Sequence, residues 1–224
     1  MWLAGPARRR PVGGVPADLR LGFHLERGMR VGLFGGSFNP AHAGHAHVAQ
    51  TAMRRLHLDR MIWLVSPQNP LKSGRDTASL AERMAGARRM AGSNPRMIVS
   101  DAEARLGSAY TVDTLNRLKA RFPGVKFVWI MGSDNLASFH RWRGWTDIAR
   151  TTPIAVVARP DTLMQSRSAP AARRYAAARR PSREAALLAD APMPAWTYLC
   201  APLNSTSSTK LRTVASTLSQ SALS

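Results

Sequence analysis

Residues 35–45, GGSFNPAHAGH, combine the residue types that bind phosphate. They follow the apolar run MRVGLF and precede a helical pattern of apolar residues. Glycine lets backbone N–H groups approach an anion, and the amino end of a helix attracts phosphate. His42 and His45 add imidazole donors that can be charged beside a polyphosphate. We therefore predict a phosphate-binding loop, which consists of the two histidines with Gly35, Gly36, Ser37, Phe38 and Gly44.

Two other interpretations of this loop stay open. It can be a tight structural turn with incidental histidines, or a metal site, because His47 lies close to His42 and His45. The metal interpretation lacks a carboxylate or thiolate within the loop to complete the ligand set. The loop matches neither G-x-x-x-x-G-K-[ST] nor G-x-G-x-x-G. The phosphate interpretation therefore depends on the position of the loop between a predicted strand and a predicted helix.

A second candidate anion site lies near the end of the chain, in NSTSSTKLR at residues 204–212. Ser207, Ser208 and Thr209 supply hydroxyl groups at the start of a predicted helix, and Arg212 follows one turn later. An ordinary serine cap accounts for one hydroxyl but not for the set. We therefore predict that this helix start also binds phosphate.

The elements that must position these residues alternate along the chain. Short apolar strands are expected at residues 30–34, 60–66, 96–100, 126–131, 153–158 and 196–200. Helices are expected at 44–57, 79–91 and 111–122, after GSDN, and from Ser207. This pattern predicts an α/β fold with a doubly wound, mostly parallel sheet. Ligands then bind beyond the carboxyl ends of the strands, where segments 35–45, 67–72, 132–145 and 203–212 are placed.

Length and composition indicate one domain with basic additions. We expect a single domain at residues 29–224, preceded by a basic low-complexity extension at 1–28 and carrying an Arg/Ala-rich insert at about 159–190. Both basic segments lack an aromatic ladder, so we interpret them as solvated, partly mobile surface. The net charge of +19 then fits anionic small substrates, and a nucleic-acid partner is not favoured.

The same data limit the cellular location. No apolar run approaches the roughly 20 residues of a spanning helix, and the arginines near the amino terminus follow the apolar residues, the wrong order for a secretory signal. A single cysteine excludes an internal disulfide. We expect a cytoplasmic protein without a membrane partner; the sequence leaves a monomer and a homodimer open.

GGSFNPAHAGH resembles the H-x-G-H signature of a nucleotidyltransferase superfamily that contains adenylyltransferases and cytidylyltransferases. NSTSSTKLR resembles its I-S-S-T-x-[IL]-R element, with Thr206 in place of the usual isoleucine. The segments VSPQNPLK, AYTVDTL and IMGSDNLASFHRWRGWTDI are similar, in order and spacing, to bacterial nicotinate mononucleotide adenylyltransferases. The resemblance covers about residues 29–212 and implies a Rossmann-like nucleotidyltransferase fold. It also implies adenylyl transfer from ATP to nicotinate mononucleotide, which gives nicotinate adenine dinucleotide and pyrophosphate for NAD biosynthesis.

The resemblance further assigns roles to individual residues. Thr111 and the backbone around Trp142 and Arg143 would hold the nicotinate carboxylate, with Trp142 stacked on the pyridine ring. Lys72 would contact the mononucleotide, and Asp134 would lie near the ATP ribose and phosphates. Each role has a purely structural alternative: Trp142 can be a core tryptophan, Lys72 a solvated loop lysine and Asp134 the N-cap of a helix.

The remaining assignments concern the chemistry. Gly132 joins the ATP-binding set, and His42, His45 and Arg212 would stabilise charge on the transferred phosphoryl group. No general base is needed, because a 5′-phosphate is mostly dianionic at pH 7. Mg²⁺ is the expected cofactor, held mainly by ATP and water and not by protein ligands. The alternatives are a sister adenylyltransferase acting on nicotinamide mononucleotide or phosphopantetheine, and a basic nucleic-acid-binding protein.

Overall fold

The computed structural model describes residues 22–67, 77–159, 166 and 168–200. Its strands form one sheet with the order β3-β2-β1-β4-β5-β7-β6, and every neighbouring pair is parallel. The strands are β1 (Arg30–Gly36), β2 (Arg60–Val65), β3 (Met97–Ser100), β4 (Lys126–Gly132), β5 (Ile154–Val157), β6 (Arg179–Arg180) and β7 (Trp196–Leu199). The prediction of a doubly wound, parallel α/β sheet is confirmed.

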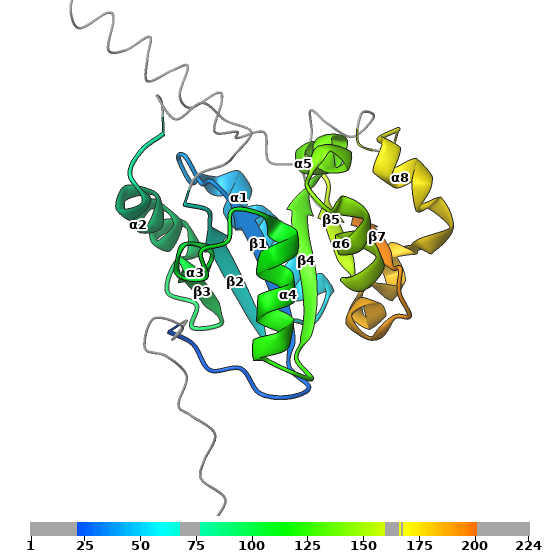
Figure 1. Ribbon diagram of the computed structural model, residues 1–224, viewed down its shortest axis with the longest axis horizontal. Coiled ribbons are helices and arrows are strands. Elements are labelled where there is room, and N and C mark those ends of the chain that lie inside the picture. Colours follow the sequence, from blue (N-terminus) through cyan, green and yellow to red (C-terminus); the bar gives the residue numbers. More distant parts are fainter. Residues whose placement is uncertain (1–21, 68–76, 160–165, 167, 201–224) are drawn as a thin grey trace, which may run out of the picture.

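Helices cover both faces of the sheet, as Figure 1 shows with α4 in front of the strands and α1 behind them. The α-helices are α1 (Ala43–Arg55), α2 (Leu80–Ala91), α3 (Ala102–Arg105), α4 (Thr111–Arg121), α5 (Ser133–Ser138), α6 (Trp145–Thr151) and α8 (Pro170–Arg174). Three 3₁₀ segments follow the same path: η3 (Phe139–Arg141), η5 (Ala176–Ala178) and η6 (Ser182–Asp190). All predicted elements within the described residues are present, whereas the helix expected from Ser207 lies outside them.

The core has two halves because alternate strand residues point to opposite faces. On β4, Phe127 and Trp129 pack under α4, α5, α6 and α8, while Val128 and Ile130 pack under α1, α2 and η6. All four side chains are buried. Burial on both faces explains why these strands are continuous apolar runs in the sequence.

The chain reverses its direction across the sheet between β1 and β4. From β1 it continues outward to β2 and β3, and from β4 it continues the other way to β5. Adjacent parallel strands whose connections leave in opposite directions open a crevice at their carboxyl ends, which form the upper edge of the sheet in Figure 1. The loops after β1, β4 and β5 therefore meet at this edge.

The basic segments differ from the expectation of solvated, partly mobile surface. At residues 22–28, Leu25 is buried in the core, and the ring of Phe23 stacks on Phe122 with a centroid distance of 6.0 Å. The Gly28 N–H also donates to the Gly124 carbonyl at 2.8 Å. The expected mobile extension to residue 28 is thus wrong for these residues, because apolar contacts fix them. We propose that the domain includes residues 23–28, ahead of the predicted start at residue 29.

The described part of the arginine-rich insert is also folded. Helix α8 buries Ala171 and Ala172, η6 buries Ala185 and Leu188, and β6 is the edge strand that pairs with β7. Its arginines at positions 173, 174, 179 and 183 stay exposed. The alanine methyl groups pack closely, a contribution that a charge count does not register, and the mobility of the insert stays a prediction. Within the described residues, no helix is long and apolar enough to span a membrane.

Candidate active site

His42 closes the amino end of α1. Its Nδ1 accepts a hydrogen bond from the Gly44 N–H at 3.1 Å, and the Nδ1 of His45 accepts one from the His42 N–H at 3.3 Å. The two bonds form a capping box in which both caps are imidazoles, where Ser, Thr, Asp or Asn is usual. The imidazole rings lie 3.8 Å apart between centroids. The two histidines predicted to act together are therefore held together by the helix start.

Burial keeps His42 neutral, and the cap decides which ring nitrogen carries its proton. Burial, and after it the positive charge of Arg159, lowers the pKa of His42 from 6.5 to about 4, against a smaller opposing effect of Asp134. Because Nδ1 accepts a hydrogen bond, the neutral ring carries its proton on Nε2. This Nε2 is buried and has no hydrogen-bond partner among the described residues. By sequence, His42 was expected to be a donor that can be charged, but with this lowered pKa it is a neutral donor at pH 7.

The loop between β1 and His42 is shaped by packing. Phe38 is buried, and its ring packs against Phe34, Trp63 and His45. Its backbone has φ = 47°, a left-handed conformation that costs a non-glycine residue on the order of 1 kcal/mol. Phe38 can therefore serve a phosphate only through its backbone. A Cβ on Gly35 would lie 2.4 Å from the ring of Trp129, so this glycine is also required by the core.

A second group of polar residues lies at the carboxyl ends of β4 and β5. Asp134 in α5 forms an ion pair with Nη1 of Arg159 at 3.0 Å, and the Arg159 N–H donates to Oγ of Ser133 at 2.8 Å. A Cβ on Gly132 would come within 2.4 Å of the Asp134 carboxylate, so the glycine makes room for the pair. The N-cap of α5 is Gly132, which rules out the N-cap interpretation of Asp134.

Arg159 was not among the predicted site residues. Its side chain is only 14% exposed, and its charge acts on His42, so it belongs to the same crevice. The available signal was its position as the first basic residue after the apolar run PIAVVA, at a strand end where ligands bind. By sequence, it was instead expected to begin the Arg/Ala-rich insert at about 159–190.

The residues expected to hold nicotinate come from α4 and the turn before α6. Thr111 is the first residue of α4, and the guanidinium of Arg143 lies 4.5 Å from the ring centroid of its neighbour Tyr110. Gly144 adopts φ = 63°, and a Cβ there would lie 3.1 Å from Val112. The structure thus brings the turn at 142–144 against the amino end of α4, which places Thr111 and Arg143 at the same edge.

Trp142 is half-buried in this turn. Its ring packs edge-on against Phe139 and Trp129, with centroid distances of 5.4 Å and 6.2 Å. These contacts anchor the indole without covering it, so the interpretation as a wholly buried core residue does not hold. An anchored, half-exposed indole is suited to stacking on a flat ring.

Five predicted site residues lie outside the described residues: Lys72, Ser207, Ser208, Thr209 and Arg212. A metal cage is not formed by the described residues, where no three His, Cys, Asp or Glu side chains come together. The carboxylate of Asp134, which faces the crevice, is already paired with Arg159. This donor set fits a cation that is held chiefly by a bound polyphosphate.

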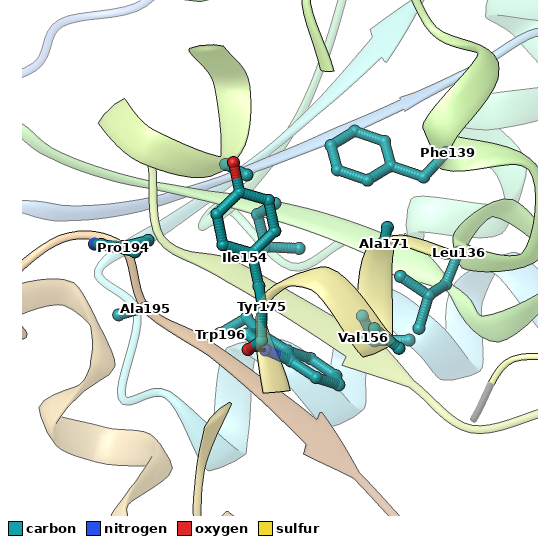
Figure 2. A pocket seen from close by; sticks show the side chains of 11 residues that line it. Leu136, Phe139, Ile154, Val156, Ala171, Tyr175, Pro194, Ala195 and Trp196 are labelled. Atoms are coloured by element: carbon teal, nitrogen blue, oxygen red, sulfur yellow. Dashed lines mark hydrogen bonds between the residues drawn. The ribbon is translucent and has the colours of Figure 1, made fainter. Parts of the chain in front are cut away.

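An apolar pocket lies elsewhere, between β5, β7, α5 and α8. Figure 2 shows Leu136 and Phe139 on one side of it and Pro194 and Ala195 on the other. None of the predicted phosphate-binding or nicotinate-binding residues lines this pocket. Apolar walls cannot stabilise phosphate charge, so the candidate active site is the polar crevice at the strand ends.

Known proteins resemble this chain over most of its length. The cytidylyltransferase-like family model matches residues 33–214, a range that includes both segments predicted to bind phosphate. A probable nicotinate-nucleotide adenylyltransferase from Caulobacter sp. (strain K31) is 69% identical over 82% of this chain and 97% of its own length. One from Cereibacter sphaeroides (strain ATCC 17025) is 54% identical over the same shares.

The fold has a counterpart among solved structures. Plasmodium falciparum nicotinic acid mononucleotide adenylyltransferase, complexed with NaAD, matches with a TM-score of 0.61 and 16% identity over 83% of each chain. This likeness concerns the fold. The two sequence relatives and the family model together show that the chain belongs to the cytidylyltransferase-like family, in the group of the nicotinate-nucleotide adenylyltransferases.

Proposed function

We propose that the chain transfers the adenylyl group of ATP to nicotinate mononucleotide, giving nicotinate adenine dinucleotide and pyrophosphate in NAD biosynthesis. Relatives that are up to 69% identical to this chain are named for this activity. The match covers nearly the whole length of these relatives. One structural observation carries the proposal: the buried Nε2 of His42, at the start of a helix in the switch-point crevice, has no hydrogen-bond partner among the residues that the structure describes. A neutral N–H donor there is suited to a phosphoryl oxygen.

In this reaction, an oxygen of the mononucleotide 5′-phosphate attacks the α-phosphorus of ATP. The new P–O bond forms as the bond to the β-phosphate oxygen breaks, and pyrophosphate leaves with that electron pair. The nucleophile is already mostly dianionic at pH 7, so no side chain has to remove a proton. The work of the protein is therefore alignment of two phosphates and stabilisation of the charge that moves between them.

The residues of the crevice divide this work. The Nε2–H of His42 is assigned to an oxygen of the α-phosphoryl group, and the α1 amino end supplies further positive potential. Arg159, held in place by Asp134, adds a fixed positive charge at the end of β5. His45 and, on the strength of the resemblance alone, Arg212 and the hydroxyls of residues 207–209 complete the phosphate site.

The acceptor site favours a carboxylate. Thr111 offers a hydroxyl at a helix start, and Arg143 stacked on Tyr110 adds a positive charge beside it. A nicotinamide NH₂ in this position gains nothing from the cation and adds a donor where donors already converge. Trp142 supplies the stacking surface. Lys72 is retained as a phosphate contact of the mononucleotide.

Mg²⁺ is the cofactor of this proposal; it would be held mainly by ATP oxygens and water and would supply positive charge to the polyphosphate. The protein residues do not coordinate it in this scheme; Asp134 stays paired with Arg159. A cytoplasmic location stays a prediction, with which ATP as a substrate is consistent. Monomer and homodimer both stay open.

Pyrophosphate release tests the proposal. The purified chain is incubated with ATP and, in turn, nicotinate mononucleotide, nicotinamide mononucleotide or phosphopantetheine. We expect nicotinate mononucleotide to give the highest kcat/KM. Equal rates with the two pyridine mononucleotides would make the enzyme dual-specific, and release only with phosphopantetheine would reassign it to a sister activity. Salt-dependent binding to random DNA without any pyrophosphate release would favour the nucleic-acid alternative.

A further inference from the structure

Arg83 is a buried arginine on α2 that the proposed reaction does not use. It is 3% exposed. Within the described part of the chain, its guanidinium donates to four backbone carbonyl oxygens, which belong to residues near the carboxyl ends of β1 and β2 and the start of α2. Nη1 donates to Ser37 at 2.9 Å and Ser66 at 2.6 Å, Nη2 donates to Pro67 at 2.7 Å, and Nε donates to Ala78 at 2.9 Å.

Burial of the Arg83 guanidinium at this position costs desolvation free energy. Among the described residues no carboxylate pairs with Arg83, and desolvation lowers the pKa of its guanidinium. An apolar side chain of similar volume would fill the space under α2 without taking a charge out of water. Helix α2 already has apolar anchors in Met84 and Ala87 on the same buried face. Stability of the helix alone therefore does not explain the arginine.

The four carbonyl groups belong to backbone that must be held in register at the crevice. Ser37 lies in the predicted phosphate loop, five residues before His42, and Ser66 and Pro67 directly follow β2. Two further bonds tie the same segments together: the Ser66 N–H donates to Gly36, and the Ala78 N–H donates to the side chain of Asn39. One planar group thus joins the phosphate loop to the end of β2 and to the start of α2.

We propose that Arg83 is a positioning residue for adenylyl transfer, which fixes the backbone of the phosphate loop so that His42 meets the α-phosphoryl group. This inference rests on the proposed function. Arg83 touches neither substrate; it acts through the Ser37 carbonyl on the loop that ends in the His42 cap. A lysine keeps the charge but cannot replace the fork, because one ammonium with three donors does not reach four oxygens spread around a guanidinium plane.

The first experiment compares R83K with wild type and with R88K. Arg88 is exposed on the same helix and serves as the matched control. Pyrophosphate release with ATP and nicotinate mononucleotide gives kcat, and urea unfolding gives the folded fraction. We expect R83K to be folded at assay temperature with kcat lowered about 10- to 100-fold, the scale of a misplacement near 1 Å. R88K should match wild type. A folded R83K with wild-type kcat would overturn the inference.

Chemical rescue separates positioning from mere packing. R83A leaves a space of guanidinium shape, so guanidinium chloride at millimolar, non-denaturing concentration should raise its kcat several-fold, and sodium chloride at equal ionic strength should not. If guanidinium gives no recovery and the loss of kcat equals the loss of folded protein, Arg83 is structural only. If R83A does not fold, the R83K comparison decides. Absence of activity in wild type itself would instead refute the proposed function, and the inference with it.

Discussion

Replacement of His42 separates its two tasks, because different ring nitrogens perform them. Nδ1 caps α1 through Gly44, whereas Nε2 is free for a substrate. In His42→Asn, the side-chain oxygen can still accept from the Gly44 N–H, but no donor reaches the position of Nε2. In His42→Ala, both functions are lost. The pair of variants therefore measures stability and catalysis independently.

The expected magnitudes follow from these contacts. Loss of the cap in His42→Ala should lower the free energy of unfolding by about 1 kcal/mol, while His42→Asn should lose little of it. Loss of the Nε2 donor should lower kcat by about 10²- to 10³-fold in both variants. Stopped or coupled pyrophosphate assays give kcat, and urea titration gives the free energy of unfolding. A folded His42→Asn enzyme with near-normal kcat would refute the assignment of His42 to the transferred phosphoryl group.

The lowered pKa of His42 adds a pH test of the same residue. The unfolded chain binds a proton at His42 below pH 6.5, but the folded protein resists it until about pH 4. The unfolded state is therefore favoured increasingly as the pH falls through this window, by about 3 kcal/mol at its lower end. Burial raises the pKa of Glu103 to about 6, which acts with the opposite sign as the pH falls. Glu103 is common to both proteins, so it cancels in the difference.

We therefore expect His42→Asn to gain stability relative to wild type between pH 6.5 and pH 4, measured by urea unfolding at several pH values. A difference that is independent of pH would show that His42 titrates normally in the folded protein.

Three further predictions concern the rest of the site and the start of the domain. Trp142→Ala should raise KM for nicotinate mononucleotide about 10-fold or more with little change in KM for ATP, because stacking is worth about 1 to 3 kcal/mol per base; a defect confined to ATP would place the indole in the wrong half of the site. Gly132→Ala should displace Asp134, since the added Cβ would meet the carboxylate at 2.4 Å. The rise in activation free energy calculated from kcat should exceed the loss in the free energy of unfolding; unchanged kinetics would show that the ion pair between Asp134 and Arg159 is dispensable. Deletion of residues 1–28 should lower the thermal midpoint relative to deletion of 1–21, because the longer deletion also removes Phe23 and Leu25, which pack on the core; equal midpoints would show that these contacts do not stabilise the domain.

Patterns of neighbouring residues determined the strands of this protein and the loop that begins α1. Continuous apolar strands predicted burial on both faces of a parallel sheet, and the spacing of glycines and histidines after the first strand predicted the loop that begins α1. Both signals are local: strand pattern and helix capping depend on residues a few positions apart. For the same reason, the sequence placed His42 at the start of a helix without any knowledge of which strands are neighbours, whereas Trp142 was assigned by the resemblance alone.

The tertiary structure decided what depends on contacts between distant segments. The neutral state of His42 results from burial and from Arg159, which lies more than a hundred positions away in the chain. Likewise, the role of Arg83 is invisible in the helical pattern of α2, because its four carbonyl partners are brought together only by the pairing of β1 with β2. By sequence, Phe23 and Leu25 belong to a basic extension, but in the folded protein they pack on the core and on the end of α4. Charge state and packing are properties of the assembled environment, so no periodicity in the sequence could have specified them.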